Sequence, residues 1–220
     1  LLQRKYMIPL LLATLIPVFN QASGVNSLLN YSVVLMQRAG LAGTDANWAD
    51  TVIKVANFAF TVLAMSLVDR RGRKFLLTIG TSGIVIGLSL VGVLFHATEN
   101  GLMEVGPTAG WLIVAAFVVF ISSFAVGPGV CVWLAMTELM PLRLRAGGMM
   151  VAQFVAMGVS YGLAQTFLPW SKAFGDSSVF LALAVVSVGY FVTVAFFLPE
   201  TKGRSLEEIE RSFAGKGESA

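Results

Sequence analysis

The chain contains an uncharged apolar run at residues 178–198, SVFLALAVVSVGYFVTVAFFL, followed at once by Pro199-Glu-Thr-Lys-Gly-Arg204. A helix needs about 20 mainly apolar residues to cross the roughly 30 Å of hydrocarbon in a bilayer, so this run predicts a membrane span. Five similar runs precede it, at residues 8–35, 49–68, 75–95, 110–137 and 146–169. Because lipid cannot satisfy backbone hydrogen bonds, each span must be helical, and we predict an all-α, polytopic membrane protein.

The composition supports the same class. Hydrophobic residues make up 56% of the chain and charged residues 12%, with a mean hydropathy of +0.80, whereas a soluble domain carries about 25% charged residues. We expect a six-span transmembrane domain at residues 1–198 and a cytoplasmic tail at 199–220. Within the tail, Ser205-Leu-Glu-Glu208 is a capping box that predicts a short amphipathic helix.

Basic residues distinguish the two sides of this layout. Of the 15 lysines and arginines, only Arg38, Lys54 and Lys172 fall on the side opposite the two chain ends. The positive-inside rule then predicts cytoplasmic termini in an integral protein of the cell (inner) membrane. We expect no nucleic-acid partner, since no basic domain lies outside the membrane, and no metal or cofactor, since His96 and Cys131 each stand alone. The missing initiator Met predicts a fragment.

Polar side chains are concentrated in the first span, where an uncompensated polar group in lipid is costly. Gln21 lies off the face that these polar residues share on a straight helix, but a break at Pro17 or at Ser23-Gly24 would turn it inward. The alternative is that these groups only form hydrogen bonds between helices. At 100° per residue, six polar residues share a stripe that favours a water-filled cavity: Asn20, Ser23, Asn26, Ser27, Asn30 and Tyr31.

Two other spans carry candidate site residues. In the second span we expect Asp50 and Lys54 to form a solvated i,i+4 pair that caps the outer end of the helix. Asn57 follows on the same face, near mid-membrane. The fourth span reads Gly127-Pro-Gly-Val-Cys-Val-Trp133, which predicts a bend. Trp133 is suited either to stacking on the C–H face of a polyhydroxy ring or to core packing.

Taken as a set, the chain's motifs resemble the C-terminal half, spans seven to twelve, of a sugar porter of the major facilitator superfamily. The motifs are Gln21-x-x-Gly24-x-Asn26, Asp69-Arg-Arg-Gly-Arg-Lys74, Glu138-x-x-Pro141-x-x-x-Arg145 and Pro199-Glu-Thr-Lys-Gly-Arg204. Within that family the pattern is similar to xylose–proton symporters and to facilitative glucose carriers. The resemblance covers essentially the whole chain and implies that an N-terminal six-span half is missing.

The resemblance implies a substrate site in the spans. Asn20 stands where the family usually has glutamine, and Asn30 where it has an aromatic residue. Ala156-Met157 replaces a polar residue followed by tryptophan. These differences imply a more open pocket that is less suited to stacking. A hexose or a pentose remains the leading candidate substrate, with a polyol, inositol or a larger glycoside as alternatives. The implied site residues are Gln21, Asn26, Asn57, Trp133, Asn20, Asn30 and Tyr31.

The same resemblance implies a charge network at the cytoplasmic helix ends, formed by Asp69, Arg73, Glu138 and Arg145. Ion pairs there would hold one conformation closed and permit the other when they break. The alternative is a set of independent surface charges, each worth about 0–1 kcal/mol.

The expected function is alternating-access transport of a small polyhydroxy solute, with the solute, the missing half and membrane lipid as partners. A non-transporting sugar sensor is the alternative, which the short tail disfavours. No set of catalytic side chains appears, so we do not expect an enzyme. Because the mid-membrane polar residues are amides, hydroxyls, Tyr or Trp, we expect no coupling proton in this half.

Overall fold

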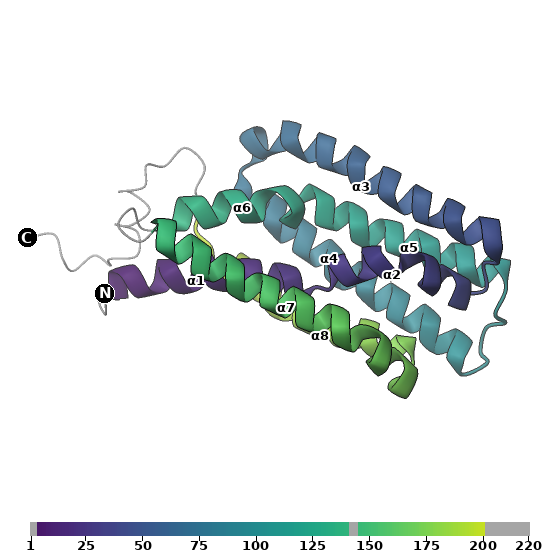
Figure 1. Cartoon of the computed structure of the whole chain (residues 1–220). Helices are drawn as coiled ribbons and strands as arrows, with labels where there is room; N and C mark the ends of the chain where they lie inside the picture. The colour runs from purple at the N-terminus through teal and green to yellow at the C-terminus, as the bar shows by residue number, and fades with distance from the viewer. Residues whose placement is uncertain (1–3, 141–144, 201–220) are drawn as a thin grey trace, which may run out of the picture.

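The computed structural model describes residues 4–140 and 145–200, in which helices run back and forth along one long axis (Figure 1). These residues contain no β-strand, so the predicted all-α class is confirmed for them. The predicted tail helix lies outside the described residues. The elements are α1 (Arg4–Ala22), α2 (Val25–Arg38), α3 (Gly43–Arg71), α4 (Arg73–Glu99), α5 (Pro107–Val126), α6 (Pro128–Leu139), α7 (Arg145–Phe174), α8 (Asp176–Val192) and a π-helical turn, η2 (Thr193–Phe197).

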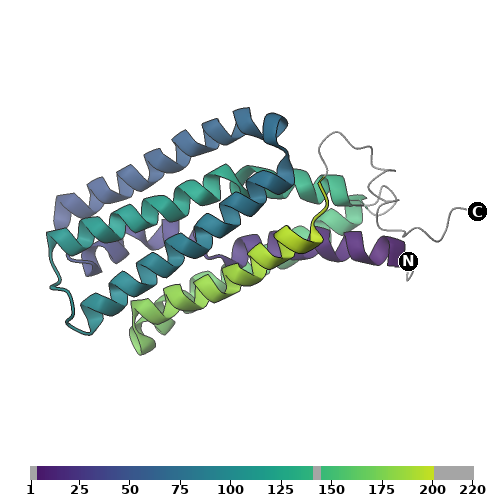
Figure 2. The same cartoon turned by 180° about the vertical axis from the view of Figure 1, so that it is seen from behind.

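The helices match the six predicted spans. Five segments are long and apolar enough to cross a membrane, namely α3, α4, α5 with α6, α7, and α8 with η2. The first span is divided into α1 and α2, which follow one another along the bundle. Figure 2 shows that α1 begins and η2 ends at the same end of the bundle, as an even number of crossings requires.

The break between α1 and α2 falls at Gly24, one of the two places that the sequence offers for it. Gly24 has φ +79°, in the left-handed region that residues with a Cβ rarely adopt. Its N–H donates to the carbonyl of Gln21 (3.1 Å) instead of continuing the α-helical pattern. A Cβ at this position would lie 2.8 Å from Cδ1 of Leu183 on α8. The backbone conformation therefore requires glycine here, and Leu183 would have to shift to admit a Cβ.

The second break, between α5 and α6, confirms the predicted bend of the fourth span. It occurs at Gly127, immediately before Pro128, which starts α6. Glycines also let α4 cross this segment closely: a Cβ on Gly80 would lie 2.6 Å from Cδ of Pro128, and one on Gly87 would lie 2.7 Å from the backbone of Phe120. The crossing thus fixes where the kinked span sits against α4.

Two apolar clusters fill the bundle. One occupies the half near the α2–α3 connection and includes Phe117, Phe120 and Phe180. The other occupies the half near the start of α1 and includes Ile16, Cys131 and Tyr190, with Trp133 packed against its edge. The two meet near the breaks at Gly24 and Gly127, so each broken span contributes its two parts to different clusters.

Helices α3 and α7 are the least covered spans. Only 17% of the most apolar window of α3 and 11% of that of α7 is buried. Phe58 on α3 and Phe154 on α7 are 73% and 80% exposed. An apolar surface of this extent is stable only against lipid or another apolar partner.

Candidate functional site

The break at Gly24 brings together two of the predicted site residues. Gln21 is buried, and its Oε1 accepts a hydrogen bond of 2.7 Å from Nδ2 of Asn26. The same Nδ2 lies 3.0 Å from Oγ of Ser160 on α7. Asn26 itself is exposed. A pair of carboxamides at a helix break, one of them open to the surroundings, offers both donors and acceptors to a hydroxyl-rich ligand.

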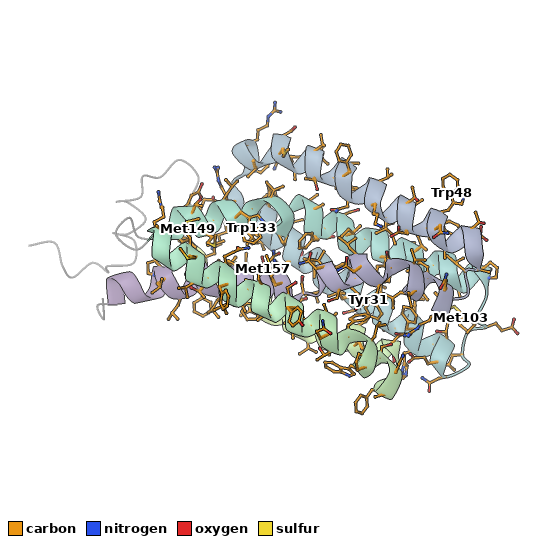
Figure 3. All side chains as sticks on the ribbon, viewed as in Figure 1. Tyr31, Trp48, Met103, Trp133, Met149 and Met157 are labelled. Atoms are coloured by element: carbon orange, nitrogen blue, oxygen red, sulfur yellow. The ribbon has the colours of Figure 1, made fainter. Side chains whose placement is uncertain are left out.

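Ser160 is a member of this cluster that the sequence prediction missed. The available signal was the spacing of Gln153 and Ser160, which lie seven residues apart and hence on one face of α7. For the substrate site, the prediction considered only Ala156 and Met157 on this helix. In the structure Ala156 is buried, whereas Met157, labelled on α7 in Figure 3, is exposed.

The predicted single stripe on the first span is wrong. Asn20, Ser23 and Ser27 are buried, whereas Asn26 and Asn30 are exposed. The left-handed turn at Gly24 interrupts the helical projection, and within α2 itself the buried Ser27 and the exposed Asn26 and Asn30 lie on different faces. The side-chain Oδ1 of Asn20 has no hydrogen-bond partner among the described residues, and Asn20 does not share the open face of Asn26.

Tyr31 lies between α2 and α7. Its hydroxyl donates to the carbonyl of Ala164 (3.2 Å), and its ring stacks on Phe167 with centroids 5.6 Å apart. Tyr31 is half-buried. Tyr31 thus anchors α2 against α7 at the border of the candidate site.

Asn57 and Trp133 lie on the two helices that complete this region. Asn57, on α3, is half-buried, and its carboxamide forms no hydrogen bond with the described residues. Trp133, on α6, is half-buried against the apolar cluster of α1, α4 and α6 (Figure 3). The packing role predicted as the alternative for Trp133 is therefore present, and part of its ring stays exposed.

The predicted cap at Asp50 and Lys54 is wrong. Helix α3 begins at Gly43, with Ala42 as its N-cap, so the pair lies inside the helix. The ion pair itself is formed, with Nζ of Lys54 2.7 Å from Oδ2 of Asp50. Asp50 also accepts a hydrogen bond of 2.5 Å from Oγ of Ser32 on α2. The pair therefore links two spans and does not end one.

A second group of charges joins the helix ends at the opposite end of the bundle. Nε of Arg73, the first residue of α4, lies 3.2 Å from Oε1 of Glu138 on α6, and both side chains are mostly buried. Nη2 of Arg145, at the start of α7, donates to the carbonyl of Thr137 (2.9 Å). The side chain of Asp69 lies outside the part of the structure that is described.

Glu200 extends this group of charges. Its carboxylate lies against Gly72, where a Cβ would come within 2.8 Å of Oε2, and Gly72 has φ +88°. The Pro-Glu-Thr motif after the last span therefore meets the Asp-Arg-Arg-Gly-Arg-Lys connection between α3 and α4. Both motifs are evident in the sequence, but Glu200 was not predicted to join the network.

A polar cluster joins the helix ends at the end of the bundle opposite Arg73 and Glu138. Nη1 of Arg38 donates to Oγ of Ser171 (2.5 Å) and pairs with Oδ1 of Asp176 (2.9 Å). Glu99 accepts the backbone N–H of Asp176 (2.6 Å) and the hydroxyl of Ser177. An acidic side chain at the N-terminus of α8 is favourable because the helix dipole is positive there. In the described residues no group of three potential metal ligands occurs.

Comparison with known proteins gives a consistent picture. A family model described as "Sugar (and other) transporter" matches residues 1–213. Facilitated trehalose transporters Tret1 of Culex quinquefasciatus and Polypedilum vanderplanki are 34% and 35% identical over 98% of the chain. The chain covers only 41% and 42% of those proteins, less than half of their length.

Solved structures agree with the sequence comparison. A double tryptophan mutant of XylE matches 97% of the chain and 44% of its own length, with 25% identity and a TM-score of 0.84. The proton:xylose symporter XylE bound to 6-bromo-6-deoxy-D-glucose matches 93% of the chain, with 25% identity and a TM-score of 0.79. The chain, an integral membrane protein, therefore belongs to the sugar (and other) transporter family.

Proposed function

We propose that this chain forms one half of a carrier that moves a sugar or polyol across a membrane by alternating access. The observation that carries the proposal is the Gln21–Asn26–Ser160 cluster at the break between α1 and α2, because broken helices place polar groups at mid-membrane in transporters. The relatives are named as transporters or symporters, which favours a carrier over a sensor. Membership of a transporter family likewise supports a non-enzymatic role.

A second six-helix unit completes the carrier in this proposal. The exposed faces of α3 and α7 flank the cluster, and the relatives are more than twice as long as the matched chain. The second unit would cover these faces and enclose the substrate between the two halves. Gln21, Asn26 and Asn57 would supply hydrogen bonds, with Trp133 and Tyr31 at the border, and Asn20 and Asn30 would act from the two sides of the break.

The proposed orientation places both ends of the chain in the cytoplasm of a cell with the carrier in its plasma membrane. Arg73 and Arg145 lie at one end of the bundle, as the positive-inside rule expects. Trp48, Trp111 and Trp170, near the opposite helix ends, are all partly exposed, as in an interfacial aromatic belt.

Transport measurements on the complete carrier in proteoliposomes test this function. Labelled hexoses, pentoses and polyols should exchange across the membrane, and Asn26→Ala should weaken binding of the transported solute by about 1–3 kcal/mol because a hydroxyl loses its partner. Asn100→Ala, at the outer end of α4 and away from the cluster, is the control and should leave affinity unchanged. Exchange of none of these solutes would contradict the proposal, and unchanged affinity in Asn26→Ala would remove Asn26 from the site.

A further inference from the structure

An ion pair inside a membrane span requires an explanation that a helix cap does not supply. At 1.5 Å per residue, Asp50 and Lys54 lie about 10 and 16 Å along α3 from its start at Gly43. Charged side chains at such depth face a partner or a water-filled cavity, since the hydrocarbon would not solvate them. Asp50 has two partners, Lys54 and Ser32. The role of the pair therefore depends on what surrounds the side chain of Lys54.

The two members of the pair have different environments. The side chain of Asp50 is 14% exposed and is held from two directions, by Lys54 and by Oγ of Ser32 on α2. The side chain of Lys54 is 57% exposed. An ammonium group has three donors, and one of them points to Asp50. The others are available to a ligand.

The side of α3 that carries Lys54 is not its most apolar side. At 100° per residue, Asp50, Lys54 and Asn57 fall within one narrow arc. Trp48, Val52 and Val55 fall on the opposite arc and are exposed, and Figure 3 shows Trp48 pointing away from the bundle. The apolar arc is suited to lipid or to an apolar protein surface. The polar arc lies next to α2, as the hydrogen bond from Ser32 requires.

The register of α2 and α3 gives the depth of Lys54 relative to the candidate site. The two helices are consecutive, antiparallel and in contact, and Ser32 is level with Asp50. Asn57 lies seven residues after Asp50 on α3. Because α2 runs in the opposite direction, Asn57 is level with the start of α2, where Asn26 lies. Lys54 lies between these levels, about 4.5 Å outward from Asn57 along the axis. It therefore stands about one helical turn outside the level at which the carboxamides meet.

We propose that Lys54 forms the outer rim of the sugar site and selects solutes that extend beyond a single ring, such as disaccharides. This inference rests on the proposed function. Asn26 and Asn57 contact the inner ring, and the free ammonium N–H groups donate to hydroxyls of the outer ring. Asp50 is a positioning residue that fixes Lys54 and balances its charge, so the rim receives a neutral solute. Ser32 holds Asp50 and thereby couples the rim to α2.

The test compares one-ring and two-ring solutes on the complete carrier in proteoliposomes. Glucose and trehalose serve as the probes, and the apparent affinity of each is measured by competition against labelled substrate. Lys54→Met keeps the length of the side chain but removes the donors. Loss of hydrogen bonds from a charged donor should weaken trehalose roughly tenfold, and glucose less than about twofold. Lys54→Arg should retain most of the trehalose affinity.

Two further variants keep the test decisive. Lys54→Met alone leaves Asp50 without its cation. The double variant Asp50→Asn with Lys54→Met removes both charges together. It replaces the single variant if the single variant fails to reach the membrane. Lys172→Met, on the exposed end of α7, removes an outer lysine away from the rim and should change neither affinity.

The outcomes separate this inference from the function on which it rests. Selective loss of trehalose affinity supports the rim. Equal loss for both sugars, no change for either, or a wild-type carrier that accepts glucose but not trehalose would overturn it while leaving a sugar carrier in place. A wild-type carrier that exchanges neither these sugars nor any other polyhydroxy solute would overturn the proposed function, and the inference with it.

Discussion

Single residues decide where this chain departs from regular helix. Gly24 is needed for its positive φ, and a Cβ there would also force Leu183 to shift. The turn at Gly24 brings the exposed Asn26 to the buried Gln21, whereas Asn20 is buried. The sequence predicted that a break was possible at this position, because Ser23-Gly24 interrupts an apolar run. It did not predict the resulting faces, because a helical projection assumes that rotation continues unchanged through the break.

Gly24→Ala tests this dependence. A Cβ in the left-handed region costs about 1–2 kcal/mol, and here it would also press on Leu183 and displace Gln21 from Asn26. We expect the melting temperature of the purified carrier and its sugar affinity both to fall. Gly43→Ala is a matched control, since Gly43 also has positive φ (+49°) but a Cβ added there would have no neighbouring atom within 4 Å.

The control should lose stability alone, with substrate affinity unchanged in a binding titration. If Gly24→Ala behaves in the same way as Gly43→Ala, the break is a structural feature that does not shape the site.

At the level of elements, the sequence predicted the spans well and their partners less well. The lengths of the apolar runs and the glycines at both breaks carried the prediction of six helices, including the bend at Gly127. What a helix touches depends on the other helices. Lys54 was assigned to a helix end because the apolar run starts at residue 49, whereas α3 starts at Gly43. Ser160 was overlooked because its contact with Asn26 joins two different spans, α7 and α2.

The Arg73–Glu138 ion pair ties α4 to α6 and is testable at this scale. Arg73→Gln and Glu138→Gln should each slow transport while leaving outward-facing sugar binding nearly intact, because each removes the same contact. Their effects on the transport rate should be non-additive, with a coupling of about 0.5–3 kcal/mol. The measurement is a double-mutant cycle of initial uptake rates.

A distant pair serves as the comparison for this cycle. Glu104 lies in the exposed outer connection before α5, so Glu104→Gln combined with Glu138→Gln should be additive within about 0.3–0.5 kcal/mol. Strict additivity in the Arg73–Glu138 cycle as well would mean that the two side chains act as separate surface charges, and the gate would have to be sought elsewhere.

For the whole molecule, the central claim is that two surfaces have different roles. In the proposed carrier, the exposed apolar faces of α3 and α7 would pack against a second helical unit, and the polar cluster between them would bind the solute. The outer cluster of Arg38, Ser171 and Asp176 and the inner pair of Arg73 and Glu138 hold the two ends of this half together. The proposed carrier would then move this unit against the second one as a rigid body around the solute site.

A structure of the complete carrier with bound sugar tests this claim most directly. We predict sugar hydroxyls within hydrogen-bonding distance, about 2.7–3.2 Å, of the side-chain amides of Gln21 and Asn26. We also predict that α3 and α7 are covered by the second six-helix unit. Sugar bound away from the break at Gly24, or a carrier in which these two helices face only lipid, would contradict the account.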